Sequence, residues 1–219
     1  IHYLQSYSQA SSRQTLQSRF GPGPTYRVQI TVDWMNNDTN KRTLRNFVIE
    51  TASIEQMPAS IYMFLDTIDK KIWDNTVFLH HESVDHVLAA APIDKTTQKV
   101  KQTQLGTIGW KTLGFPEYHE NLPHEKYTVG FAGLGPTFYI NTMDNSEIHG
   151  PGGQDHHLLP SDADPCFGRV VDGIDVVDDL VQYGTLQPSK SASTDSSSQH
   201  PWSTEEHALT HIVSAKVLL

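Results

Sequence analysis

Apolar and polar residues alternate along several stretches of the chain in the pattern that is typical of β-strands. Residues 26–34 alternate in this way, residues 36–40 have the composition of a turn, and residues 43–51 predict a second strand. Short apolar runs at residues 75–81, 137–142 and 167–171 are rich in β-branched and aromatic side chains, which buried strands favour. Residues 207–219 alternate again and predict the last strand. The pattern therefore predicts a mainly β fold.

Two segments show helical spacing instead. The first begins at Pro58, which the first turn of a helix tolerates, and its apolar residues recur every three or four positions over residues 61–72. The second follows a tight turn at Asp172-Gly173, after which apolar residues recur at the same spacing over residues 174–181. We therefore expect two helices beside the strands.

The N-terminal residues differ in composition from the rest of the chain. Residues 1–25 are rich in Gln and Ser, show little apolar periodicity and end in Gly-Pro repeats, which interrupt regular structure. We interpret them as a polar N-terminal arm or stem that precedes one domain over residues 26–219. The Ser-rich residues 189–203 are interpreted as a loop.

Charge and composition argue against a nucleic-acid partner and against a membrane span in this sequence. The 219 residues carry a formal net charge of −9 without a basic stripe, which argues against a nucleic-acid partner. No apolar run approaches the roughly 20 residues that span a bilayer, although an anchor upstream of Ile1 stays open. Cys166 is the only cysteine, so no internal disulfide forms, and its place on a predicted core strand favours an inert buried thiol.

Two motifs in the C-terminal half resemble those of the cyclophilin-type prolyl isomerases. Residues 137–142 read TFYINT and residues 164–177 read DPCFGRVVDGIDVV, where that family shows SQFFICT and HVVFGKVVDGMDVV. The opening strand pair and the helix after Pro58 also resemble the start of a cyclophilin. The resemblance covers residues 26–219 and implies a cyclophilin-like, eight-stranded antiparallel β-barrel capped by two α-helices.

The resemblance also locates the family's cleft, and there this sequence departs from the pattern. The family motif FHRxxPxFMxQGG falls on residues 78–90, where Phe78 is kept, His80 takes the arginine position, and Asp85 and His86 replace the Phe and Met. No register supplies an arginine. That arginine is thought to weaken the amide resonance that opposes prolyl rotation, so we expect very weak or absent isomerase activity.

Further cleft positions are replaced in the second half of the chain. The glutamine of SQFFICT becomes Thr137 and its second Phe becomes Tyr139. The family's tryptophan has no counterpart, with Leu159 nearest by spacing, and its histidine falls on Asp164. From the resemblance we expect the ligand to touch Phe78, Thr137, Tyr139 and Leu159.

These replacements leave three functions open. The first is a binding module that takes extended peptide or protein segments in the old cleft with little or no catalysis. The second is a repurposed enzyme in which His80, Asp85, His86 and Asp164 do acid–base chemistry on a peptide or glycan, because a histidine beside a carboxylate titrates near neutral pH. In that case the Tyr139 hydroxyl would lie near the His80 imidazole. An active prolyl isomerase is the third. No cofactor is expected.

A long loop over residues 145–163 is expected to overhang the cleft. His149, Asp155, His156 and His157 are possible metal ligands, but adjacent histidines on an extended chain point in opposite directions. A solvated loop with incidental histidines is the interpretation that we favour.

The cellular location follows from weaker signals. Asn37-Asp38-Thr39 is an N-glycosylation sequon in a predicted turn, and residues 1–24 have the composition of a stem. We expect the secretory lumen or the outside of the cell, with tethering through the arm. A cytosolic location is the alternative.

Overall fold

The structure, a computed structural model, places eight strands in one closed barrel. It describes residues 2–36, 41–79, 86–97, 99–101, 105–106, 109, 112–155, 157–183 and 211–218. The strands are β1 (Arg27–Asn36), β2 (Lys41–Thr51), β3 (Thr76–Leu79), β4 (Val87–Asp94), β5 (Thr128–Phe131), β6 (Phe138–Asn141), β7 (Cys166–Asp172) and β8 (His211–Leu218). They are hydrogen-bonded in the order β1-β2-β7-β5-β6-β4-β3-β8 and every pair is antiparallel. The predicted mainly β barrel is confirmed.

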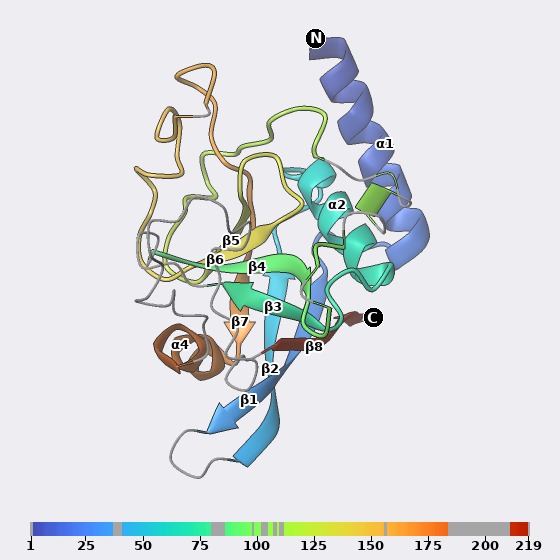
Figure 1. Cartoon of the computed structure of the whole chain (residues 1–219). Coiled ribbons are helices and arrows are strands. Elements are labelled where there is room, and N and C mark those ends of the chain that lie inside the picture. The colour runs from blue at the N-terminus through green and yellow to red at the C-terminus, as the bar shows by residue number, and fades with distance from the viewer. Residues whose placement is uncertain are drawn as a thin grey trace.

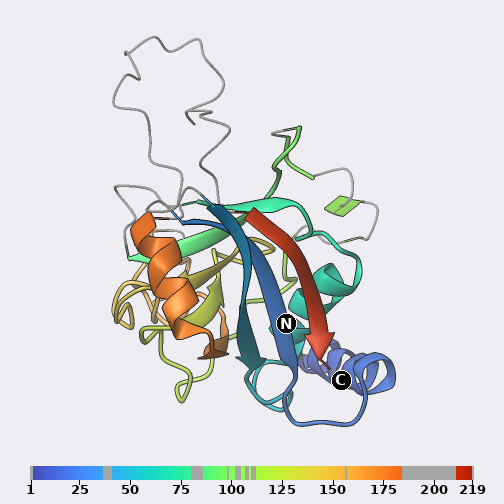
Figure 2. The same cartoon turned by 90° about the horizontal axis from the view of Figure 1, so that it is seen from below.

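Helices lie against the barrel at separate places (Figure 1, Figure 2). The two predicted helices are α2 (Pro58–Asp69) and α4 (Ile174–Tyr183), and the views show them on different sides of the barrel. Gly173 forms the predicted turn before α4 with φ +72°, and a Cβ there would lie 2.5 Å from the carbonyl oxygen of Asn46. Glycine is therefore the residue that this turn accepts. No described helix is long and apolar enough to cross a membrane.

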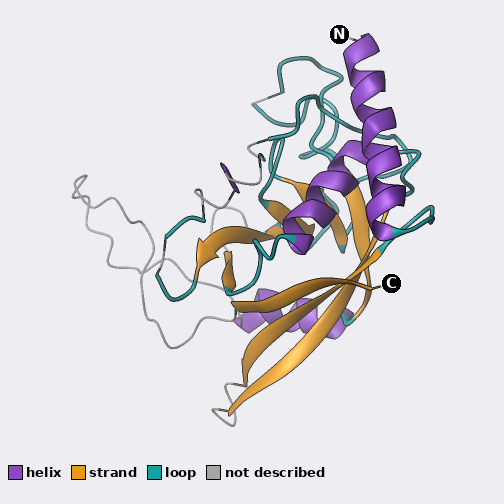
Figure 3. Cartoon of the chain, turned by 90° about the vertical axis from the view of Figure 1, so that its right-hand side faces the viewer, coloured by secondary structure: helices purple, strands orange, loops and turns teal. Residues whose placement is uncertain are grey.

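A third helix, α1 (His2–Phe20), forms within the segment that we interpret as an arm, and the sequence pattern does not predict it. It packs along α2, as Figure 3 shows. Its Leu16 side chain is fully buried, and the Arg19 guanidinium contacts the carboxylates of Asp66 at 2.5 Å and Asp69 at 2.7 Å. The boundary at residue 25 stays a prediction, but this part of the arm is held against the barrel's own helix.

The barrel interior is apolar and α2 supplies part of it. The Phe64 ring of α2 lies 5.3 Å from the ring of Phe138 and 5.0 Å from that of Phe167. The N-terminus of α2 has no cap from its own N-cap residue. The buried carboxylate of Glu117 instead accepts the backbone N–H groups of Ala59 and Ser60, at 3.2 and 2.7 Å. A carboxylate suits this helix end because the unpaired N–H groups there are partly positive.

Candidate functional site

Loops formed by residues 112–127, 142–155 and 157–165 run beside β5 and β6 (Figure 1), and polar side chains from these loops contact one another and β6. We call five of them the histidine cluster: His124, Tyr139, His149, His157 and Asp164. The side chains of all five are buried, with 0% of His124 and 2% each of Tyr139 and Asp164 exposed. The side chains of His149 and His157 are 9% and 4% exposed. They come from three segments: the residues before β5, strand β6, and the loop that leads to β7.

The Asp164 carboxylate is the centre of the cluster. It contacts His149 Nδ1 at 2.8 Å, His157 Nε2 at 3.3 Å and the Tyr139 hydroxyl at 3.4 Å. An ionised carboxylate only accepts hydrogen bonds, so both of these imidazole nitrogens are assigned a proton. A proton on Nδ1 alone leaves a lone pair on Nε2 of His149, and this buried nitrogen has no hydrogen-bond partner in the described part of the chain.

His124 and Tyr139 contact each other within the cluster. His124 Nε2 lies 3.0 Å from the backbone carbonyl oxygen of Asp164, to which it donates, and His124 Nδ1 lies 3.3 Å from the Tyr139 hydroxyl. Burial lowers the pKa of His124 to about 4, so the ring is neutral at pH 7. Burial, with Asp164 nearby, raises the pKa of Tyr139 well above its usual range. The tyrosine keeps its single proton, which it donates to either His124 or Asp164.

The aromatic rings of the cluster pack on one another. The His149 ring centroid lies 4.8 Å from that of Tyr139, 5.4 Å from that of His124 and 5.3 Å from that of His86. Beneath these rings, Asn145 Nδ2 donates to the backbone carbonyl of His86 at 2.8 Å. The loop residues therefore fill the space beside β6 with their own side chains.

Gly130 leaves room for the Tyr139 ring because it has no side chain. A Cβ at this position of β5 would lie 2.9 Å from Cζ and from the hydroxyl oxygen of Tyr139, and 2.8 Å from the carbonyl oxygen of Pro165. Real side chains essentially never approach so closely. The small residue on β5 and the large ring on β6 are thus matched across the strand pair, in which Gly130 and Tyr139 are direct partners.

Some of the predicted site residues come together here. Tyr139 and Asp164 meet in the cluster, and His86 is half-buried against His149. His80 and Asp85 lie outside the described residues, so the expected contact between Tyr139 and His80 stays a prediction.

Others do not join the cluster. Phe78 fills the barrel interior against Phe47 with 0% exposed, so it contributes core packing and offers no surface to a ligand. Leu159 is 59% exposed, and Thr137 is half-buried.

The interpretation of the long loop as solvated is wrong for two of its histidines, because His149 and His157 point inward and bind Asp164. Asp155 is exposed, and His156 lies outside the described residues. In the described part of the chain, no group of three or more His, Cys, Asp or Glu side chains is arranged to hold a metal ion. Sequence reasoning missed His124 altogether, since it lies in a polar stretch without periodicity.

A family comparison now identifies the fold. The model for the cyclophilin type peptidyl-prolyl cis-trans isomerase/CLD family matches residues 36–200. The chain belongs to the cyclophilin family. No curated protein sequence matched it. In this cyclophilin, Tyr139 and Asp164 occupy the positions at which the sequence resemblance puts cleft residues of the family, and both are buried within the cluster.

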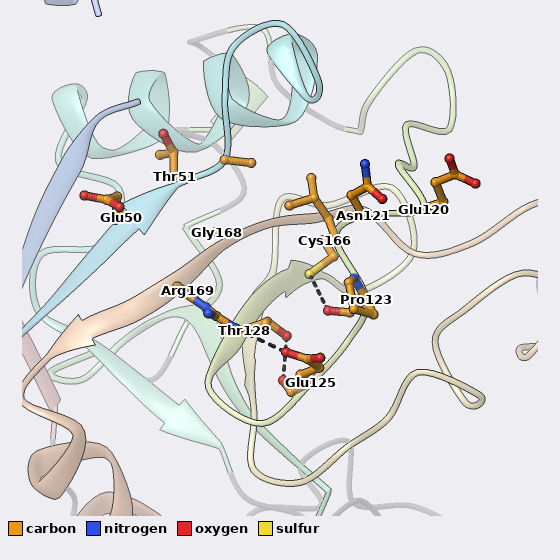
Figure 4. A pocket seen from close by; sticks show the side chains of 12 residues that line it. Glu50, Thr51, Glu120, Asn121, Pro123, Glu125, Thr128, Cys166, Gly168 and Arg169 are labelled. Carbon is orange, nitrogen blue, oxygen red and sulfur yellow. Dashed lines mark hydrogen bonds and ion pairs between the residues drawn. The ribbon is translucent and has the colours of Figure 1, made fainter. Parts of the chain in front are cut away.

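A hollow of about 500 Å³ is lined in part by the residues next to His124 in the chain, Pro123 and Glu125 (Figure 4). Its lining includes Pro123, Glu125, Cys166 and Arg169. Arg169 Nη2 pairs with Glu125 Oε2 at 3.2 Å, and the Cys166 thiol lies 3.5 Å from the Pro123 carbonyl oxygen. The predicted burial of Cys166 is confirmed, and burial raises the pKa of its thiol to about 12, which keeps it protonated.

Proposed function

We propose that this cyclophilin binds extended peptide or protein segments and does not catalyse prolyl isomerisation at an appreciable rate. The observation that carries the proposal is the state of Tyr139 and Asp164. Each is 2% exposed, and each is hydrogen-bonded to imidazoles of its own chain. Catalysis requires contacts with the substrate that strengthen in the transition state. The polar atoms of Tyr139 and Asp164 are instead hydrogen-bonded within the histidine cluster, so they do not make such contacts.

The sequence supports the same conclusion from the other side of the cleft. Residues 78–90 contain no arginine that could donate to the prolyl nitrogen. Loss of the donor removes the group that would weaken amide resonance, while the closed barrel and its cyclophilin topology are kept. A scaffold of this kind retains a surface for protein segments without the means to accelerate rotation about the peptide bond.

Two NMR measurements on the full chain test this function. Exchange spectroscopy on an acetyl-Ala-Ala-Pro-Ala-amide peptide should show no cis–trans exchange above the uncatalysed rate. An ordinary cyclophilin, run in parallel, verifies that the assay detects catalysis. Titration of the ¹⁵N-labelled protein with the same peptide should give saturable shifts at the Gly130 and Tyr139 amides. Exchange as fast as with the ordinary cyclophilin contradicts the proposal.

A second function, acid–base catalysis on a peptide or glycan, is favoured by one observation. His149 Nδ1 is fixed by Asp164 at 2.8 Å, which leaves Nε2 as a lone-pair acceptor without a partner in the described chain. This is the arrangement of an imidazole base oriented by a carboxylate. Saturable turnover of a chromogenic peptide or glycoside, lost in His149→Phe, would support it. A lack of turnover with both substrate classes would remove it.

We also propose a location in the secretory lumen or outside the cell. The support is the sequon at Asn37 and the composition of residues 1–24. Asn37 lies outside the described residues. Mass spectrometry of native protein before and after glycosidase treatment tests the proposal, and an unmodified Asn37 would remove its main support.

A further inference from the structure

The histidine cluster concentrates imidazoles around a single carboxylate in a buried space. His149 and His157 contact Asp164 directly, at 2.8 and 3.3 Å, and His124 contacts its backbone carbonyl at 3.0 Å. The ring of His86 packs on His149 with its centroid 5.3 Å away. Imidazole is the side-chain group whose charge ordinarily changes between pH 5 and 8.

The charges of the closed cluster limit how many protons it holds. The titratable groups that face it from the described elements are the four imidazoles, Asp164, Tyr139 and Cys166, and both Tyr139 and Cys166 hold their protons at neutral pH. Beyond Cys166, Glu125 and Arg169 pair with each other. One imidazolium is compensated by Asp164, but every further proton adds an uncompensated buried charge. Such a charge is costly away from water.

The loop that closes the cluster, residues 145–163, has few apolar anchors. Its large apolar side chains face solvent, with 39% of Ile148, 91% of Leu158 and 59% of Leu159 exposed. Two of its side chains, His149 and His157, bind Asp164. The loop is therefore held beside β6 by polar contacts of its imidazoles with Asp164 and not by apolar packing of its own.

We propose that mild acid releases residues 145–163 from Asp164 and opens the cleft beside Tyr139, so that this cyclophilin binds peptide segments more tightly in acidic than in neutral solution. The proposal rests on the proposed peptide-binding function for the class of ligand. The opening itself is a property of the chain and is measured without any ligand.

His124 gives the size of the effect to expect. In the closed cluster its pKa is about 4, whereas a hydrated imidazole has a pKa of about 6.5. The open form, in which His124 is hydrated, therefore binds a proton more readily than the closed form, and it becomes more favourable as the pH falls below about 6.5. From pH 7.5 to 5.0 the equilibrium constant for opening rises about 30-fold from this one group.

Amide hydrogen exchange measures the opening directly. The amides of Asn145, Gly152 and Asp164 are hydrogen-bonded within the closed loop region, to the carbonyl oxygens of His124, Asp162 and His149. Their protection factors, corrected for intrinsic exchange, should fall at least 10-fold between pH 7.5 and 5.0. Amides of β1 and β2 report global unfolding, which is itself sensitive to His124, so they should stay better protected than the loop amides at both pH values. Unchanged loop protection, or loop amides as well protected as those of β1 and β2 at pH 5.0, overturns the proposal.

Two variants test whether the histidines of the cluster cause the pH-dependent opening. The double variant His124→Gln, His149→Gln removes two titrating rings and should lose most of the pH response. His119→Gln is the matched control, because its imidazole bonds the backbone of Asn121 outside the cluster, and it should respond as the wild type does. If the double variant does not fold, the wild-type comparison of loop and barrel still decides the outcome. A full response in a folded double variant overturns the assignment.

Titration with the acetyl-Ala-Ala-Pro-Ala-amide peptide at both pH values separates the two proposals. Loop opening without peptide binding at either pH contradicts the peptide-binding function and leaves the acid opening in place. Equal affinity at both pH values, with a loop that stays protected, contradicts the acid opening and leaves peptide binding in place. Tighter binding at pH 5.0 together with an opened loop supports both.

Discussion

Removal of the Asp164 carboxylate is the most direct test of the cluster. Asp164→Ala takes the acceptor from His149 Nδ1 and His157 Nε2, which lie at 2.8 and 3.3 Å. The Tyr139 hydroxyl loses less, because His124 Nδ1 at 3.3 Å remains as an acceptor. A buried donor that loses its partner costs about 1–3 kcal/mol, so two donors give about 2–6 kcal/mol. Each imidazole can move its proton to its other ring nitrogen, which offsets part of this cost. We therefore expect Asp164→Ala to lower the free energy of unfolding by about 3 kcal/mol.

The loss is measured as the free energy of unfolding at pH 7.5, from urea denaturation followed by the fluorescence of the buried Trp73 and the other tryptophans. Asp164→Asn keeps one acceptor oxygen and should cost less, about 1–2 kcal/mol. The matched control is Asp162→Ala, which removes a half-buried carboxylate of the same loop that accepts the Leu159 N–H at 3.0 Å. We expect this control to cost under about 1 kcal/mol. A loss below about 1 kcal/mol in Asp164→Ala, or equal losses in both alanine variants, would refute the reasoning.

Three further predictions concern stability. Glu117→Ala should lower the free energy of unfolding by about 2 kcal/mol, because it leaves the first N–H groups of α2 without their buried acceptor, and a loss under about 0.5 kcal/mol in urea denaturation would contradict this. Gly130→Ala should lower the free energy of unfolding by about 1–3 kcal/mol, because the added Cβ clashes with the Tyr139 ring and the Pro165 carbonyl oxygen, and wild-type stability would contradict this. The folded-state pKa of His124, about 4, lies below the unfolded value of about 6.5, so its stabilising contribution is complete above pH 6.5 and is lost as the pH falls to 4. Wild type should therefore lose about 2 kcal/mol more than His124→Gln between pH 7.5 and 5.0, and parallel stability curves would exclude this role.

Local patterns in the sequence predicted most of the strands and two of the helices, whereas the eight-stranded barrel was implied by the resemblance to the cyclophilins. Strand alternation depends only on side chains two positions apart, and helical stripes depend on positions three or four apart, so both are visible along the chain. The turn at Gly173 was predictable for the same reason, since its φ of +72° is a local property that glycine favours. The motifs at residues 137–142 and 164–177 extended these patterns to a family, and the match over residues 36–200 agrees.

Helix α1 shows where local patterns stop. Its mostly polar sequence has little apolar periodicity, so no stripe marks it as a helix. Its position is fixed by partners far along the chain, such as Asp66 for Arg19 and Glu117 for Gln9. Most helices in proteins are stabilised by such tertiary packing, and these contacts have no signature within the helix itself.

The histidine cluster was decided by the tertiary structure alone. His124 and Asp164 are 40 residues apart, and His149 reaches Asp164 from a loop in which no repeating pattern predicts the direction of a side chain. The sequence marked Tyr139 and Asp164 through their places in family motifs, but it gave no sign that the loop histidines turn inward. The reason is physical: hydrogen bonds between irregular segments depend on how the barrel brings those segments together, and only the closed fold determines that.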